Sequence, residues 1–166
     1  MINSTIDNAL IQYVKTATGI NKVIWAYPNA PEETPPYVVI TLINIQNANG
    51  VRSESGDYAK TITVRFDVFT ADDTHLMRAN DLVDELDNED TRITLEQAGL
   101  NGIKEMSDPA DVTFIDKAYY QYRAFVDIRF GAVFTRTYNY TTIERVSGTI
   151  LDVEFDERTE DYTEEE

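Results

Sequence analysis

The single histidine of the chain, His75, lies close to two carboxylates, Asp72 and Asp73. A histidine oriented by a carboxylate can serve as a general base. The same three residues also fit a helix start, where acidic groups cap the free amides and a neighbouring histidine faces solvent. No nucleophile motif accompanies His75, so we predict a surface helix residue with no catalytic role.

Acidic clusters are the other candidates for chemistry. Asp72–Asp73, residues 87–90 and the C-terminal acids offer carboxylates to a divalent cation, but none has the glycine-containing spacing of a calcium loop. The absence of cysteine and the single histidine exclude thiolate and multi-histidine zinc sites. The chain also lacks a nucleophile elbow, a phosphate-binding glycine loop and a His-Glu-x-x-His motif. A glycosidase-like carboxylate pair stays open, because any two of the 30 acids can converge. We predict no catalytic, cofactor-binding or metal-binding residues and no enzyme activity.

A strand-like segment around residues 119–129 carries a different kind of chemistry. Arg123, Phe125, Asp127 and Arg129 alternate with apolar residues and therefore share one face of the strand. Opposite charges beside an aromatic ring suit a heterologous interface, in which an arginine of one copy meets a carboxylate of the next. A lone domain that leaves this face in water is an equally good interpretation.

Length and charge limit the class of protein. At 166 residues, with 42% hydrophobic residues, the chain is long enough for one domain with a core. The net charge of −16 argues against a protein that binds nucleic acid through a basic patch. Residues 152–166 hold nine acids and one arginine, a net charge of −8, and residues 1–151 hold the other −8. We therefore predict a folded domain over 1–151 and an acidic extension over 152–166, which is either solvated or an arm for a basic neighbour. No targeting or membrane-spanning segment is visible in the sequence.

The first half of the chain reads as one helix and three strands. Helical spacing of apolar residues starts at Asn3 or Ser4 and stops at Gly19. A short strand over 23–27 and a proline-rich connector over 28–36 follow. Residues 37–45 carry apolar side chains at successive positions, which predicts an internal strand covered on both faces. Residues 47–58 are polar and predict a long flexible hairpin loop before an alternating strand over 59–70.

The second half begins with an amphipathic helix. It starts at a cap within residues 72–74 and ends near residue 87, with a solvent-facing polar side. A short helical turn over 94–99 and a short strand over 101–106 follow. A long β-region over 117–140 and a terminal or edge strand within 143–155 complete the order. Adjacent strands with few intervening helices indicate an α+β fold, with a mostly antiparallel sheet and helices packed on one face.

The sequence resembles the tail terminator, or neck terminator, proteins of tailed bacteriophages. The resemblance covers about residues 1–153. It rests on the helix ending at Gly19, on Trp25 before the prolines, and on the segments 36–40 (PYVVI), 61–69 (TITVRFDVF), 72–86, 122–130 (YRAFVDIRF) and 143–150 with its Ser-Gly-Thr-Ile. These are patterns of hydrophobicity and spacing, and nothing is carried onto the residues after Phe155.

The resemblance implies a ring-forming structural protein of the virion. A homo-oligomeric ring, typically a hexamer, caps the head-proximal end of the tail tube, stops tail growth and joins the tail to the head. The implied partners are further copies of the chain, the tail tube protein and head–tail connector or neck proteins, with the tail sheath as a further candidate. DNA only passes through the channel, and no membrane or cofactor takes part. The protein would lie in the tail or neck of the virion, and in the host cytoplasm during assembly.

Two groups of residues are then candidates for assembly. We predict that Arg65, Arg123, Phe125, Asp127 and Arg129 lie at the subunit interface. We predict that the 47–58 loop, with Arg52, Glu54 and Asp57, faces the lumen or a neighbouring ring. Two alternatives stay open: a monomeric acidic DNA mimic that inhibits a nucleic-acid enzyme, and another neck or tail protein such as a connector or tube subunit.

Overall fold

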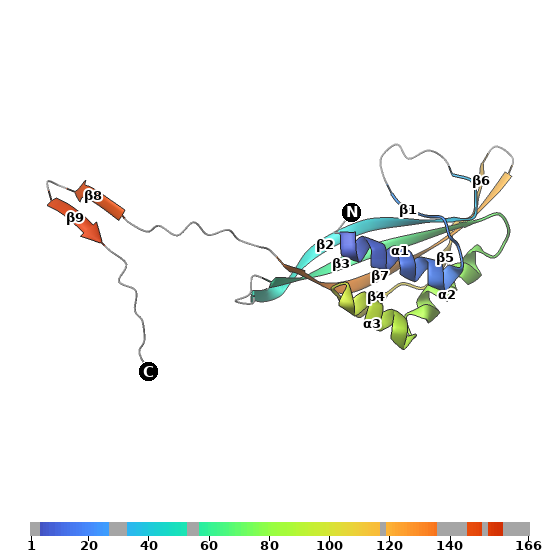
Figure 1. The fold of residues 1–166 in the computed structure, drawn as a ribbon. Coiled ribbons are helices and arrows are strands. Elements are labelled where there is room, and N and C mark those ends of the chain that lie inside the picture. Colours follow the sequence, from blue (N-terminus) through green and yellow to red (C-terminus); the bar gives the residue numbers. More distant parts are fainter. Residues whose placement is uncertain are drawn as a thin grey trace. The chain divides into compact units, whose positions relative to one another are not determined.

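The computed structural model describes residues 4–26, 33–52, 57–116, 119–135, 146–150 and 153–157. The chain divides into two units, Met1–Arg136 and Thr137–Glu166. Among the described residues, the first unit shows three helices and a seven-stranded sheet, and the second shows a two-stranded hairpin (Figure 1). The α+β class is therefore confirmed, whereas ring formation stays a prediction.

Two long strands form the centre of the sheet. β3 (Asp57–Thr70) and β7 (Tyr119–Thr135) pair antiparallel without a register shift, from Asp57 opposite Thr135 to Thr70 opposite Tyr122. Both segments alternate apolar and polar residues, and this period of two sends one set of side chains to each face. The clean alternation accounts for the uninterrupted pairing.

Shorter or less regular strands flank this centre. β2 (Tyr37–Arg52) pairs antiparallel with β3, and β1 (Val23–Trp25) pairs parallel with the first residues of β2. On the other side of β7 lie β4 (Leu100–Met106), β5 (Ala110–Asp111) and β6 (Phe114–Asp116). The sheet is mixed, with one parallel pair among antiparallel ones.

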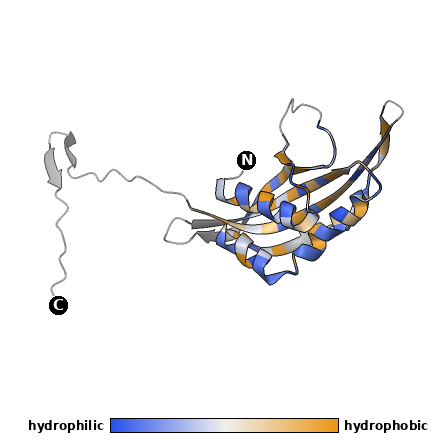
Figure 2. Ribbon diagram, turned by 45° about the vertical axis from the view of Figure 1, so that its right-hand side comes forward, coloured by the Kyte–Doolittle hydropathy of each residue, from blue (hydrophilic) through white to orange (hydrophobic). Residues whose placement is uncertain are grey.

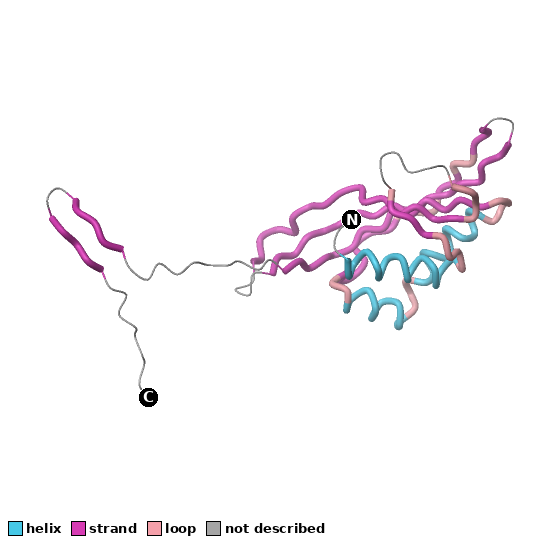
Figure 3. The backbone as a smooth tube through the Cα atoms, turned by 45° about the horizontal axis from the view of Figure 1, so that its top comes forward, coloured by secondary structure: helices cyan, strands magenta, loops and turns pink. Residues whose placement is uncertain are grey.

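All three helices lie on one face of the sheet (Figures 1 and 3). They are α1 (Ser4–Thr18), α2 (His75–Glu85) and α3 (Glu89–Gln97). Hydrophobic and hydrophilic residues alternate along them (Figure 2), as expected for helices that bury one stripe. The largest fully buried side chains between helices and sheet are Phe66, Phe130, Ile6, Leu10, Ile40, Ile62, Leu82, Leu86, Leu100, Ile128, Val14 and Val38.

The end of α1 follows the expected chemistry, whereas Thr74, the N-cap residue of α2, makes no side-chain capping bond to the helix. α1 ends where Gly19 adopts a φ of 69° and its amide donates to the Lys15 carbonyl over 3.0 Å. Asp72 accepts hydrogen bonds from the amide and the hydroxyl of Thr74 just before α2. These observations confirm the first helix and the amphipathic helix.

The sequence prediction was wrong about α3, which spans nine residues where a single turn over 94–99 was expected. Leu95 is the one buried residue of α3, so no apolar stripe marks this helix in the sequence. Its start carries the missed signal: the Asn88 side chain accepts from the Asp90 amide over 3.0 Å, and Glu89 and Asp90 follow in the first turn.

Two predictions about β2 were also wrong. The expected long loop over 47–58 is β-structure up to Arg52 and again from Asp57, and residues 53–56 lie outside the described part. The strand is also not covered on both faces along its length, because Ile43 is 48% and Ile45 is 43% exposed. Helices cover only the first part of β2, and its polar continuation is held by backbone pairing with β3.

The second unit is a hairpin of β8 (Val146–Ile150) and β9 (Val153–Glu157), paired from Val146 opposite Glu157 to Ile150 opposite Val153. The expected terminal strand is therefore two short strands that pair with each other. The hairpin spans the position between residues 151 and 152 at which the sequence places a boundary, and the predicted division into domains stays a prediction. Residues 158–166, which hold much of the acidic extension, lie outside the described residues.

Truncation of a core phenylalanine tests this packing. Phe66 is fully buried, and its ring contacts Tyr13 edge-on at 5.7 Å between centroids. Phe66→Ala should lower the free energy of unfolding by about 3–5 kcal/mol, because it removes buried surface and leaves a cavity. Phe114→Ala is the matched control, since that ring is 43% exposed, and should cost much less. Equal losses for both variants in urea denaturation would contradict the described core.

A charged ladder on the helix-free face of the sheet

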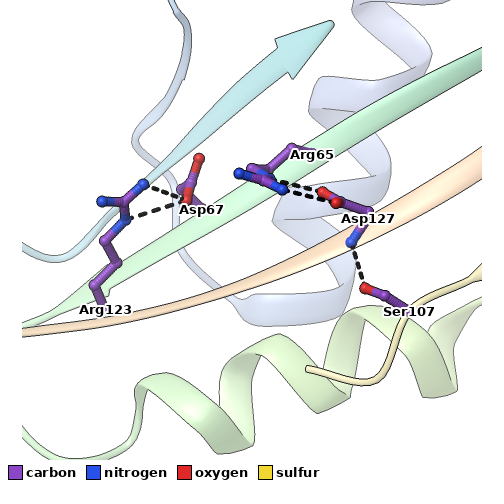
Figure 4. Close-up of polar contacts among 5 residues, drawn as sticks. All are labelled: Arg65, Asp67, Ser107, Arg123 and Asp127. Atoms are coloured by element: carbon purple, nitrogen blue, oxygen red, sulfur yellow. Dashed lines mark hydrogen bonds and ion pairs between the residues drawn. The ribbon is translucent and has the colours of Figure 1, made fainter. Parts of the chain in front are cut away.

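Two arginine–aspartate pairs lie on the face of the sheet opposite the helices (Figure 4). Arg65 of β3 lies directly opposite Asp127 of β7. Its Nε and Nη2 donate to the two carboxylate oxygens of Asp127 over 2.7 and 2.8 Å. Arg123 of β7 donates from Nε and Nη2 to Oδ1 of Asp67, over 3.1 and 2.8 Å. We call these four residues the charged ladder.

Aromatic rings support both guanidinium groups. The Arg65 guanidinium lies 4.2 Å from the centre of the Phe125 ring, and that of Arg123 lies 5.3 Å from the Phe69 ring. These distances fit cation–π contacts. The Phe69 ring in turn stacks on Tyr37 at 4.5 Å, which links the ladder to β2. Each arginine is thus fixed by a carboxylate and by an aromatic face at the same time.

The ladder is partly shielded from water. The Asp67 side chain is 7% exposed, whereas those of Arg65, Arg123 and Asp127 are between 27% and 34% exposed. The hydrogen bond to Asp127 raises the pKa of the Arg65 guanidinium above its ordinary value, so that the group keeps its charge. Ser107 completes the arrangement, because its hydroxyl accepts from the Asp127 amide over 2.9 Å.

The structure therefore joins most of the predicted interface residues within one chain. Arg65, Arg123 and Asp127 have intramolecular partners, and Phe125 lies under Arg65. Arg129 is half-buried on the same face, opposite Thr63 of β3. Sequence reasoning missed Asp67, although it lies two residues after Arg65 in an alternating strand and so shares its face. A role of these residues between subunits stays a prediction.

The second predicted group is placed only in part. Arg52 is the last residue of β2 and Asp57 is the first of β3, while Glu54 lies outside the described residues. Arg52 pairs with Tyr58 after a register shift that follows Asn47. Whether this end of the hairpin faces a lumen or a neighbouring ring stays a prediction.

His75 is not the surface residue that the sequence predicted, since it is only 5% exposed. Its Nε2 lies 3.1 Å from both Asp111 Oδ1 and the Thr113 hydroxyl, and its ring lies 5.5 Å from that of Tyr122. The missed signal is the spacing 75, 79, 82 and 86, which places His75 on the buried stripe of α2. Asp111 and Thr113 both contact the same ring nitrogen, Nε2. In a hydrolase triad the nucleophile and the carboxylate contact opposite nitrogens of the histidine ring. His75 therefore has the geometry of a packing residue that connects α2 to β5 and to the residues before β6.

The helix side of the molecule concentrates negative charge. Residues 81–96, which run from the middle of α2 to near the end of α3, hold seven acids and one arginine, a net charge of −6 out of the −8 of residues 1–151. In a cleft between α1 and α3, the Glu85 carboxylate accepts hydrogen bonds from Asn88 and Thr91. Burial, and secondarily the charge of Glu85, raise the pKa of Tyr13 well above its ordinary value, so its hydroxyl stays protonated and donates to the Leu82 carbonyl. Within the described ranges, no three potential metal ligands lie together.

The first test of the ladder is a double-mutant cycle on Arg65→Ala and Asp127→Ala. A bidentate pair at this depth should give a coupling energy of about 1 kcal/mol in urea denaturation. The exposed helix pair Arg78–Asp81, at 3.6 Å, is the control and should give about 0–0.5 kcal/mol. A coupling no larger than that of the control would show that the ladder contributes nothing to folding.

The second test uses pH at the His75 contact. Hydrogen bonds from the Thr113 hydroxyl and amide, and then from His75, hold the pKa of Asp111 below its ordinary value. A lowered pKa stabilises the fold above the unfolded-state value, near 4, and this contribution disappears as the pH falls through the folded-state pKa. Asp111→Asn should therefore lower the melting temperature at pH 5–7, and the difference from the unmodified chain should shrink toward pH 2. Asp108→Asn in the preceding turn is the control; an identical pH profile for the two variants would refute the assigned contacts.

The chain matches one family of known proteins over most of its length. The model of one family, described as phage neck terminator protein, matches residues 4–158, which include both units in part or whole. No curated protein matches the chain. None of the helices in the described ranges has the length and apolar character needed to cross a bilayer. The matched range covers α1 to β9 and nearly the whole chain, which confirms the resemblance seen in the sequence and supports a structural role in the phage tail or neck. The chain belongs to the phage neck terminator protein family.

Proposed function

We propose that the protein forms a homo-oligomeric ring, most simply a hexamer, on the head-proximal end of the phage tail tube. The ring ends tail growth and presents a surface for the neck. The observation that carries this proposal is the family match over residues 4–158, since the family is that of neck terminators. Its partners would be further copies of the chain, the tail tube protein and connector or neck proteins, with the tail sheath as a further candidate.

The charged ladder supports burial of the helix-free face between copies. An unpaired charge is costly to remove from water, whereas a charge with complete hydrogen bonds costs much less. The carboxylate and aromatic partners of Arg65 and Arg123 lie in the same chain. A second copy can therefore cover this face without leaving either arginine unpaired. The ladder thus acts as a preformed polar surface, and contacts between copies add to it through Phe125 and Arg129.

The charge distribution favours the same arrangement. The charged ladder together with Arg129 holds three arginines and two aspartates, whereas residues 81–96 carry a net charge of −6. Copies of an acidic protein approach each other most easily away from α2 and α3. A negative channel wall would let DNA pass without binding, and a basic lumen in the assembled particle would refute that part of the proposal. Family membership favours the ring over the DNA mimic.

Charge reversal at Arg123 is a poor test on its own. It would place a carboxylate beside the nearly buried Asp67, so the loss of rings would not separate an interface role from damage to the fold. Thr63 lies on the same face between β2 and β7, opposite Asn44 and Arg129, and it takes no part in the ladder.

The test compares two threonine variants. The unmodified chain should give rings in negative-stain images and a single oligomer by size-exclusion chromatography with light scattering. Thr63→Lys should shift it toward monomer, because it adds a like charge opposite Arg129 on the helix-free face. Thr16→Lys, on the exposed side of α1, should leave the oligomer intact. Long stacked tubes would indicate a tube subunit, and monomers at every concentration, including with purified tail tubes added, would refute the ring.

A further inference from the structure

The outer edge of β2 is unpaired over much of its length. β1 covers the first residues of β2, from Val38 to Ile40, and the Ala26 amide donates to the Ile40 carbonyl over 2.9 Å. In the described part of the chain, no strand pairs with that side of β2 after Ile40. The segment from Thr41 onward therefore presents backbone amides and carbonyls that can accept another strand.

This edge lacks the charges and prolines that usually protect an edge strand against strand addition. Residues 41–49 contain no charged residue and no proline, and Ile43 and Ile45 are 48% and 43% exposed. Both edge strands contain two register shifts, but β4 on the opposite edge also carries Lys104 and Glu105, and Gly102 with a φ of 68°. Charges on an edge strand oppose edge pairing in monomeric proteins. Of the two edges, β2 is the one suited to a partner strand.

A second exposed apolar feature lies at the other end of the sheet. β6 and the first residues of β7 form a two-stranded arm, with Ile115 opposite Tyr120 and Phe114 opposite Gln121. Ile115 is 65%, Tyr120 is 66% and Phe114 is 43% exposed, and the outer edge of β6 has no partner strand among the described residues. A two-stranded ribbon with exposed apolar side chains is marginally stable alone and suits docking against another surface.

The arm and the β2 edge of one chain cannot meet. Ile45 lies at the level of Ile62 and Phe130 in the sheet, ten residues along β7 from Tyr120. At about 3.3 Å per residue this separates the two features by about 33 Å. They lie at opposite ends of the sheet in Figures 1 and 3. Two complementary features that are fixed far apart on one chain can satisfy each other only between copies, in a head-to-tail contact.

We propose that the β6–β7 arm of one copy adds to the free edge of β2 in the next copy, with Ile115 and Tyr120 covering Ile43 and Ile45. Charge favours a second copy as the occupant. Residues 107–122, which hold the arm and the turn before it, carry three aspartates and one lysine, Lys117, a net charge of −2, and the uncharged 41–49 edge of a second acidic copy receives them without like-charge repulsion. This contact rests on the proposed ring, and it supplies the same head-to-tail step at every subunit.

Cysteine cross-linking tests the contact directly, because the chain has no native cysteine. The double variant Ile45→Cys with Ile115→Cys cannot form a disulfide within one chain, since the Cα atoms must approach within about 7 Å. Under mild oxidation this variant should give a series of covalent oligomers on a denaturing gel. The control pairs Ile45→Cys with Ile93→Cys on α3, whose exposure of 44% matches that of Ile45, and it should give several-fold less product.

Each outcome has a separate meaning when light scattering is run on the same samples. A series of cross-linked oligomers only in the first double variant supports the contact, and the largest band gives the ring size. Dimers from Ile45→Cys alone would mean that two β2 edges meet each other, which overturns the proposal. If light scattering shows an oligomer but the first double variant cross-links no better than the control, the arm contact is overturned and the ring is not. If light scattering shows a monomer and no cross-linked product forms, both are overturned. Cross-linked oligomers that lengthen without reaching a fixed largest size would keep the contact and reject ring closure.

Discussion

The pairing of β3 with β7 is the constraint on which the rest of the structure depends. Fourteen residues of β3 face fourteen of β7 without a shift, from Asp57–Thr135 to Thr70–Tyr122. Because side chains alternate between the faces, this one register decides which residues meet the helices and which meet water. Phe66 and Val126 enter the core through it, and Arg65 and Asp127 are brought together on the opposite side.

The two faces created by this pairing have different chemistry. The helix side buries the apolar core and presents acidic helices outward, whereas the other side carries arginine, aspartate and aromatic rings that satisfy one another. An assembly protein needs surfaces that stay soluble before assembly and can be covered afterward. The charged ladder is compatible with both requirements, because three of its four side chains are about one-third exposed in the single chain and all four would stay paired if a second copy covered them.

Sequence patterns predicted the elements whose one face is buried. Alternation around Val64 and Ile128 located β3 and β7, and helical spacing with Gly19 located α1. Patterns failed where burial is slight: α3 has one buried residue, and residues 43–47 of β2 are exposed at successive positions before a polar sequence that looked like a loop. The charged ladder could be predicted in part, because alternation along the strand places Arg123 and Asp127 on one face. Which arginine meets which aspartate depends on the register between distant strands, and the sequence alone does not specify it.

That register explains a further property of the ladder, which concerns folding. A slip of β3 by two residues along β7 would leave every apolar side chain on the same face, so hydrophobic burial hardly opposes it. In one direction the slip would set Arg65 against Arg129 and Asp67 against Asp127, two like-charge pairs directly opposite each other. In the other direction the slip would set Asp67 directly opposite Arg123 and leave Arg65 diagonal to Asp127, so opposite charges would stay neighbours. The four charged residues therefore oppose one of the two nearest misaligned registers, which the apolar side of the sheet does not distinguish from the native one.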